Sequence, residues 1–157
     1  MSSSSQLIPV IRIQTADFDL GAELRRLQQR TTDSGAVASF VGSVRNQNEG
    51  DQVSTLTLEH YPGMTEQSLA AICRQAGARW PLLDVTIIHR VGTLQPGDQI
   101  VLVAVSSAHR AAAFDACRFI MDFLKTEAPF WKKENTPDGS RWVEARASDE
   151  EAARRWD

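Results

Sequence analysis

The chain has 157 residues, of which 42% are hydrophobic, and its 17 basic and 20 acidic residues give a formal net charge of −3. This length favours one domain with a proper core, and the acidic balance excludes a global electrostatic case for binding nucleic acid or an anionic membrane. The longest apolar run, residues 100–105, is far too short to span a bilayer, and residues 1–6 are polar. We therefore expect a soluble, cytoplasmic protein in which any anion-binding site is local.

The cysteines and histidines do not form a recognisable catalytic or metal site. Cys73 and Cys117 fall on the apolar sides of predicted helices, which favours buried, reduced thiols over a disulfide framework, a zinc site or a nucleophile. The three histidines are scattered, without carboxylates or cysteines at metal-ligand spacing. His60 and His89 lie in predicted strands and are interpreted as histidines of the core or of a strand edge. We expect no metal and no cofactor.

Strands and helices alternate along the chain, behind a tail (1–6) that we expect to be disordered. The predicted domain (7–157) begins with a strand (7–13), a helix that Asp17 or Asp19 caps and that ends near residue 29, and a strand (36–44) with its hairpin partner (53–61). A helix (64–79) and two strands joined by a Pro-Gly turn (85–94 and 99–106) follow. The chain then forms a helix (111–124), an edge strand (141–146) and a terminal helix (148–156), in which Ser148 and Glu151 are in capping-box register. Paired strands interspersed with helices predict an α+β fold, a mainly antiparallel sheet with helices packed on one face.

The helix over residues 111–124 organises the candidate site. Its apolar residues recur at spacings of three and four, so one face should be buried; they are Phe114, Cys117, Ile120, Met121 and Leu124. Pro129 lacks an amide hydrogen and disfavours helix at the preceding residue, so the helix should stop a few residues earlier, with Lys125 in its last turn. Lys132 and Lys133 then follow in a non-helical segment, which its aromatic residues, Phe130 and Trp131, can hold against the body of the protein.

A second group of cations stands at the beginning of the same helix. Residues 106–110 (SSAHR) join a strand to the helix, and serine is a favoured N-cap. Free amide hydrogens of the first turn, together with His109 and Arg110, make a plausible site for phosphate or carboxylate. The simpler alternatives are a surface His-Arg pair at one end and, at the other, lysines that only complement the helix dipole.

Six segments in uninterrupted order, covering nearly the whole chain after residue 35, resemble the large, catalytic subunit of molybdopterin synthase. They are residues 41–46 (VGSVRN), 58–64 (LEHYPGM), 88–92 (IHRVG), 107–110 (SAHR), 124–134 (LKTEAPFWKKE) and 141–143 (RWV). The resemblance implies a sulfurtransferase that converts cyclic pyranopterin monophosphate to molybdopterin by installing a dithiolene. Sulfur would arrive as a thiocarboxylate on the C-terminal glycine of a small ubiquitin-like subunit, two of which would flank a central homodimer in a heterotetramer.

The resemblance also implies roles for individual residues. Lys125 and Lys132 match the family's two key lysines; we hypothesise that Lys125 is the acid/base or covalent residue and that Lys132 binds and polarises the thiocarboxylate. The implied substrate-binding set comprises Ser43, Val44, Arg45, His109, Arg110, Lys125, Lys132, Lys133 and Glu134. Position 43 departs from family members with lysine there, which weakens one possible phosphate contact. The protomer that supplies each side chain is left open.

The residues fit such a reaction for physical reasons. A cyclic phosphate and a thiocarboxylate are both anions, so several fixed cations are needed to bring them together. Arginine can donate two hydrogen bonds to a phosphate, and the pKa of lysine falls near other cations or in a dry pocket. Two alternatives are a non-catalytic adaptor that keeps the partner surface, and an RNA-phosphate-binding domain. The acidic charge, the single tyrosine and the lack of a glycine-rich phosphate loop argue against the second.

Overall fold

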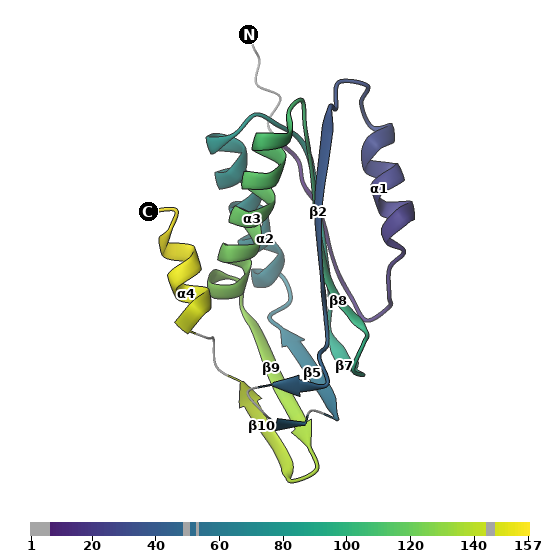
Figure 1. Cartoon of the computed structure of the whole chain (residues 1–157), viewed down its shortest axis with the longest axis vertical. Helices are drawn as coiled ribbons and strands as arrows, with labels where there is room; N and C mark the ends of the chain where they lie inside the picture. The colour runs from purple at the N-terminus through teal and green to yellow at the C-terminus, as the bar shows by residue number, and fades with distance from the viewer. Residues whose placement is uncertain (1–6, 49–50, 53, 144–146) are drawn as a thin grey trace.

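Most of the strands that the structure describes belong to two separate sheets. Figure 1 shows the computed structural model, which describes residues 7–48, 51–52, 54–143 and 147–157. The predicted tail (1–6) and residues 144–146 of the predicted edge strand lie outside the described residues. Within them are two four-stranded sheets and a short ribbon of β3 (Gln47–Asn48) and β4 (Asp51–Gln52). The fold is α+β in a single domain, as predicted.

The first sheet forms the body of the protein. Its strand order is β1 (Val10–Gln14), β6 (Leu82–Arg90), β8 (Gln99–Ser107) and β2 (Ala36–Ser43). The β1–β6 pair is parallel and the other two pairs are antiparallel. The central strands β6 and β8 carry long apolar runs that are almost completely buried, as expected of strands covered on both faces.

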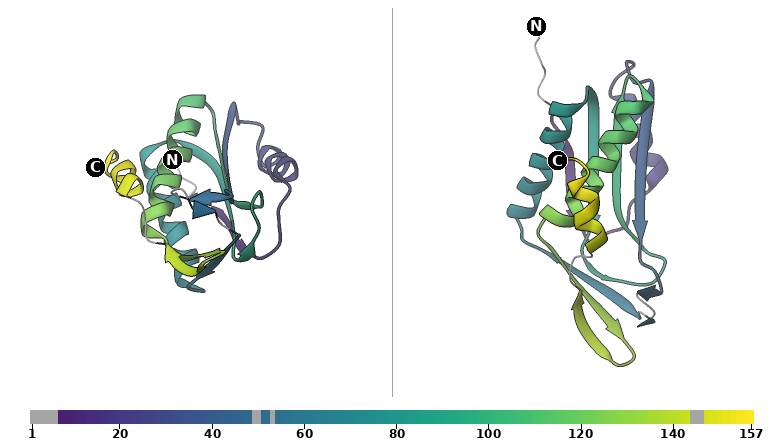
Figure 2. Two further views of the ribbon diagram at one scale, coloured as in Figure 1. Left: turned by 60° about the horizontal axis from the view of Figure 1, so that its bottom comes forward. Right: turned by 60° about the vertical axis from the view of Figure 1, so that its left-hand side comes forward.

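Helices cover both faces of this sheet, not one as predicted. Two helices, α2 (Met64–Arg79) and α3 (Arg110–Glu127), pack on one face over Val85, Ile87 and Val103. Helix α1 (Leu20–Gln29) packs on the opposite face, where Leu27 contacts the cluster around Ile88 and Leu102. Figures 1 and 2 show α1 separated from the other helices by the sheet. Successive strand residues face opposite sides, so each central strand supplies both cores.

The first two helices begin where the sequence predicts. The carboxylate of Asp19 accepts a hydrogen bond from the amide of Ala22, which makes Asp19 the N-cap of α1. Helix α2 has the predicted bounds, and it buries Leu69, Ile72 and Cys73.

The second sheet extends below the body in Figure 1 and corrects a predicted pairing. Its order is β10 (Gly139–Val143), β9 (Phe130–Thr136), β5 (Thr55–His60) and β7 (Gly92–Leu94), and every pair is antiparallel. The prediction that the strand at residues 53–61 is the hairpin partner of β2 is wrong, because β2 pairs with β8. The predicted strand 85–94 is divided at Val91, whose amide donates to the carbonyl of Gln14. Its two halves therefore enter different sheets.

The C-terminal helix α4 (Ala147–Arg154) packs against α3. The indole nitrogen of Trp156 donates to the carboxylate of Asp122 at 2.7 Å, and its ring meets Trp80 and Phe119 edge-on. The predicted capping box is wrong in register, because the helix begins at Ala147 and Ser148 already lies within it. Among the described residues, no helix combines the length and apolarity needed to cross a membrane.

Candidate functional site

The candidate site begins at the C-terminal end of α3. The helix ends at Glu127, and Ala128 takes extended dihedrals (φ −80°, ψ 132°) as expected before Pro129. Lys125 therefore lies in the last turn, as predicted, with an exposed side chain. The predicted buried face is correct except at Phe114, whose side chain is 65% exposed.

The segment after Pro129 is a strand, β9, and not the irregular segment that we predicted. Residues facing the same way alternate along a strand, so Lys132 and Glu134 share one face while Lys133 points to the other. The Lys133 ammonium lies 5.7 Å from the centre of the exposed Trp142 ring on that other face. The structure therefore brings Lys132 and Glu134 together on one face and separates Lys133 from them. Trp131 is 47% exposed and does not hold the segment down.

Glu134 is buried and paired with a cation that the sequence analysis missed. Its side chain is 4% exposed, and one carboxylate oxygen lies 3.2 Å from both Nε and Nη2 of Arg141. The two residues are directly opposite in the β9–β10 hairpin. A signal for this pair existed, because the turn-favouring residues at 136–139 (TPDG) set positions 134 and 141 across from each other in a hairpin.

His89 is a buried residue near both candidate lysines, Lys125 and Lys132. Its ring is 4% exposed and stacks on Phe130, with centroids 3.8 Å apart and planes 15° from parallel. The pKa of His89 is lowered to about 3, mainly by burial and also by the charges of Lys125, Lys132 and His60, while its hydrogen bond with the Arg90 carbonyl acts in the opposite direction. Both lysines are therefore near enough to act on one ring. The interpretation of His89 as a satisfied core histidine is confirmed.

The neutral ring has a defined tautomer. Nδ1 of His89 lies 2.8 Å from the carbonyl oxygen of Arg90. A carbonyl can only accept, so Nδ1 carries the proton and Nε2 is left as an acceptor. The site thus combines an uncharged imidazole with two cationic side chains, one from a helix end and one from a strand.

Ser43, Val44 and Arg45 lie where β2 leaves the first sheet. The Val44 amide donates to the Asp98 carbonyl at 2.9 Å, and the Gly97 amide donates to the Val44 carbonyl at 2.8 Å. Val44 itself is 6% exposed, whereas Ser43 and Arg45 are exposed. A buried valine tied to a turn therefore fixes the backbone from which Arg45 projects.

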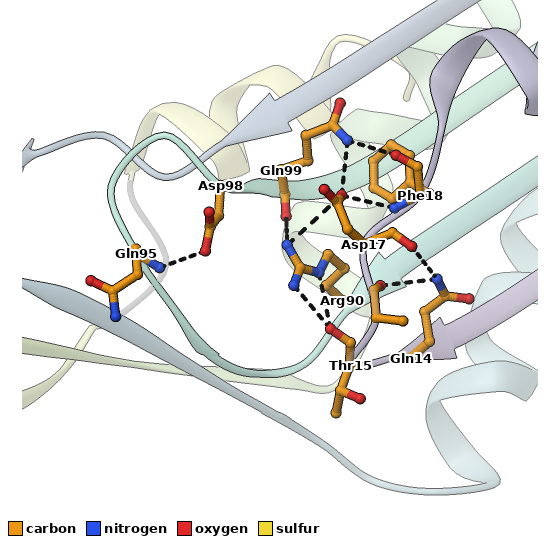
Figure 3. Close-up of polar contacts among 9 residues, drawn as sticks. Gln14, Thr15, Asp17, Phe18, Arg90, Gln95, Asp98 and Gln99 are labelled. Atoms are coloured by element: carbon orange, nitrogen blue, oxygen red, sulfur yellow. Dashed lines mark hydrogen bonds and ion pairs between the residues drawn. The ribbon is translucent and has the colours of Figure 1, made fainter.

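A polar network links the end of β6, the strand that carries His89, to the start of β8 and to the segment after β1 (Figure 3). Arg90 donates through Nε and Nη2 to the Thr15 carbonyl and through Nη1 to the Gln99 carbonyl, at 3.0–3.1 Å. The Gln99 side chain, the Phe18 amide and the charge of Arg90 lower the pKa of Asp17. Gln99 is the residue opposite Ser43 in the sheet. The network therefore joins the end of β6 to the start of β8, beside the end of β2.

His109 and Arg110 lie at the opposite end of α3 from the lysines. His109 is the N-cap without a side-chain cap bond, and both residues are exposed. The predicted serine cap is wrong, because Ser106 and Ser107 belong to β8 and Ser107 donates its hydroxyl to the Pro81 carbonyl. Arg110 and Lys125 stand fifteen residues apart in one helix, which is about 22 Å at 1.5 Å per residue. One chain does not bring these two groups together.

Comparison with known proteins identifies the fold and its family. A sequence model of the family described as MoaE protein matches residues 13–127. The molybdopterin synthase catalytic subunit of Ralstonia nicotianae is 61% identical over 149 residues, which cover 95% of this chain and 85% of that protein. The structure of the molybdopterin biosynthesis MoaE protein from Burkholderia ambifaria matches with a TM-score of 0.83 and 57% identity, covering 95% of this chain and 98% of that one.

A more distant structure shows the same fold at 19% identity. It is a Helicobacter pylori protein-protein complex of subunits 1 and 2 of molybdopterin-converting factor; the match has a TM-score of 0.72 and covers 87% of this chain and 91% of that one. Together with the closer relatives, these matches show that the chain belongs to the MoaE family. Its curated relatives are molybdopterin synthase catalytic subunits, and the chain is accordingly an enzyme of molybdopterin biosynthesis.

Proposed function

We propose that the protein is a sulfurtransferase that converts cyclic pyranopterin monophosphate to molybdopterin, with sulfur from the C-terminal thiocarboxylate of a small ubiquitin-like subunit. The observation that carries the proposal is that Lys125, at the end of α3, and Lys132, on β9, both lie close enough to the buried ring of His89 for their charges to lower its pKa. Membership of the MoaE family supports the substrate class. We further propose that residues 7–157 act as one catalytic domain.

The two lysines have different proposed roles in the reaction. In each transfer the thiocarboxylate sulfur forms a carbon–sulfur bond to a side-chain carbon of the pterin and displaces an oxygen from that carbon, and water cleaves the acyl–sulfur bond, leaving a carboxylate on the small subunit. Lys125 acts as acid/base or forms a covalent bond to the substrate. Lys132 binds the thiocarboxylate and polarises it, while Glu134 fixes the strand beside it through Arg141.

The remaining proposed contacts hold the substrate phosphate. Arg45 presents a planar fork that can donate two hydrogen bonds to it, and Ser43 and Val44 line the same turn. Lys133 contributes from the outer face of β9, as a contact to the substrate or to the incoming subunit. His109 and Arg110 are too distant from Lys125 within one chain, so we propose that they come from a second protomer of a homodimer.

Two features support such a homodimer. Strand β2 is an edge of the first sheet, and an unpaired edge is a natural surface for a second chain. The exposed rings of Phe40, on β2, and Phe114, on α3, lie on neighbouring elements beside this edge. The homodimer would stand at the centre of a heterotetramer, with a small subunit at each end.

The small subunit has a proposed docking edge as well. Strand β10 is an edge of the second sheet and lies beside β9, which carries Lys132. An extended tail can add to such an edge through backbone hydrogen bonds with little side-chain volume. The two buried, free thiols, Cys73 and Cys117, are compatible with a reducing compartment, and we propose that the reaction takes place in the cytoplasm.

A single-turnover assay tests the proposal. Purified protein is mixed with cyclic pyranopterin monophosphate and the thiocarboxylated small subunit, and the dithiolene is measured after oxidation to its fluorescent derivative. Loss of a general acid/base usually lowers a rate by about 100-fold or more, so we expect at least that loss in Lys125→Ala.

The control is Arg25→Ala, which removes an exposed cation on α1, across the first sheet from the site. It should react as the wild-type protein does. Lys125→Ala should still assemble with the small subunit. More than about a tenth of wild-type activity in Lys125→Ala would contradict its catalytic role, and no product from intact wild-type complex would contradict the reaction itself.

A further inference from the structure

The hydroxyl group of Thr65 connects the segment between the two lysines to the neighbouring strand. Thr65 is fully buried in the first turn of α2. Its Oγ1 accepts a hydrogen bond from the Tyr61 amide and donates one to the Pro129 carbonyl, both at 3.0 Å. A hydroxyl is a small neutral group that can donate one hydrogen bond and accept another at the same time. These two bonds therefore depend on the hydroxyl.

This hydroxyl continues the β5–β9 ladder by one step. The last paired residues of that ladder are His60 and Phe130, so the next residues along the register are Tyr61 and Pro129. The chain turns away there into α2, through Gly63 at φ +86°. The Thr65 hydroxyl stands between the two backbone groups as the strands separate. It accepts from the Tyr61 amide, just after the end of β5, and donates to the Pro129 carbonyl at the α3–β9 junction, and both groups would otherwise lose their partner.

The junction sets the relation between Lys125 and Lys132. Lys125 is fixed to α3 and Lys132 to β9, so only residues 128–129 separate the two rigid elements. The Phe130 amide donates to the Ala128 carbonyl at 2.9 Å, and the Phe130 ring stacks on His89. These contacts hold the junction at its strand end. The bond from Thr65 holds its middle, and it comes from a helix 64 residues earlier in the sequence.

We propose that Thr65 is a positioning residue for the sulfur transfer, which acts through the Pro129 carbonyl to hold the ammonium groups of Lys125 and Lys132 in their reactive relation. This inference rests on the function proposed above. Because Thr65 is fully buried and both hydrogen bonds of its hydroxyl go to the protein backbone, its loss should lower kcat and leave the KM values for the pterin and the small subunit nearly unchanged. Displacement of a reacting group by about 1 Å can lower a rate by about 100-fold.

The test compares three variants of the full chain in the complex with the small subunit. Thr65→Val keeps the side-chain shape and removes the hydroxyl, whereas Thr65→Ser keeps the hydroxyl. Thr86→Val is the matched control, because Thr86 is also buried but lies on β6, on the face that packs against α1. We expect kcat to fall about 10- to 100-fold in Thr65→Val, to recover in Thr65→Ser and to remain at the wild-type level in Thr86→Val.

Three results would overturn the proposal: wild-type kcat in Thr65→Val, an equal defect in Thr65→Ser, or an equal defect in Thr86→Val. Hydrogen exchange of the Tyr61 amide gives a readout that does not need turnover. Exchange should be faster in Thr65→Val and restored in Thr65→Ser. If the wild-type complex forms no dithiolene, the proposed reaction is wrong. Hydrogen exchange alone then decides whether Thr65 holds the junction, and unchanged exchange of the Tyr61 amide in Thr65→Val would refute that role.

Discussion

His89 is a buried ring whose charge state affects both the stability of the fold and the candidate site. It stacks on Phe130 and bonds to the Arg90 carbonyl. Burial, with further lowering by the Lys125, Lys132 and His60 charges, brings its pKa to about 3. Protonation would place another positive charge beside the two lysines, so the ring stays neutral wherever the enzyme is folded and active.

The low pKa predicts an acid-sensitive stability. An unfolded histidine titrates near pH 6.5, so between about pH 6.5 and 3 the unfolded chain binds a proton that the folded chain does not. The stabilisation is therefore present above pH 6.5 and is lost as the pH falls. From pH 7 to 4.5 the loss from this group is about 2–3 kcal/mol. His89→Phe keeps a ring that can stack on Phe130 but has no group to titrate. Between pH 7 and pH 4.5 its free energy of unfolding should therefore fall by about 2–3 kcal/mol less than that of the wild-type protein.

Urea unfolding at pH 7 and pH 4.5, at one protein concentration, measures this difference. His109→Gln is the control, because His109 is exposed and its loss should leave the wild-type pH dependence in place. At pH 7, His89→Phe should be less stable than wild type by about 1 kcal/mol, since the hydrogen bond to Arg90 is lost. A pH dependence equal to that of wild type would show that His89 is not a buried neutral group.

Single residues were predictable where local rules act. Asp19 as an N-cap and Lys125 in the last helical turn follow from neighbouring residues alone. Thr65 and Arg141 were missed because their importance comes from partners brought close by the fold, at Pro129 and Glu134. Phe114 was predicted to be buried because its spacing is correct for the apolar face. Spacing does not show where that face ends.

At the level of elements, the β9–β10 hairpin connects the candidate site to the proposed partner surface. Val143 lies opposite Lys132, and β10 is the outer strand of the second sheet. A tail that adds to β10 would therefore run within one strand of Lys132. Backbone hydrogen bonds are the main source of affinity in this kind of binding.

Proline at position 143 should weaken binding of the small subunit. Val143→Pro removes a backbone donor and disturbs the edge strand, so we expect the Kd for the thiocarboxylated subunit to rise by about 10-fold or more, as for the loss of one or two hydrogen bonds. Isothermal titration calorimetry measures the change. Val143→Ala keeps the amide and is the control; equal Kd values for the two variants would exclude tail addition at this strand.

The pairing of elements was less predictable than their positions. The sequence predicts the strands at 36–44 and 53–61 but pairs them with each other, whereas β2 pairs with β8 and β5 pairs with β7 and β9. Strand β9 was missed because its residues after Phe130 are largely polar and its buried face carries Lys132 and Glu134. Burial of Glu134 depends on Arg141 and on β5, which a window of local sequence does not contain.

For the whole molecule, the length of α3 separates two cationic groups that the proposed reaction needs together. Arg110 begins the helix and Lys125 lies in its last turn, about 22 Å away. A helix cannot shorten, so a site that uses both residues must take them from different chains. In a symmetric dimer each site would then combine Lys125 of one protomer with Arg110 of its partner.

Mixed dimers test this arrangement directly. Lys125→Ala and Arg110→Ala homodimers should each lack activity, because every site has lost one of the two residues. If the two residues of a site come from different protomers, a dimer with one chain of each kind has one site with both substitutions and one intact site. Its activity should then return to about half of wild type. If each chain formed its site alone, both sites of the mixed dimer would carry one substitution and activity would stay absent. Coexpression with two affinity tags isolates the mixed dimer, and a tagged mixture of wild-type chains sets the reference rate.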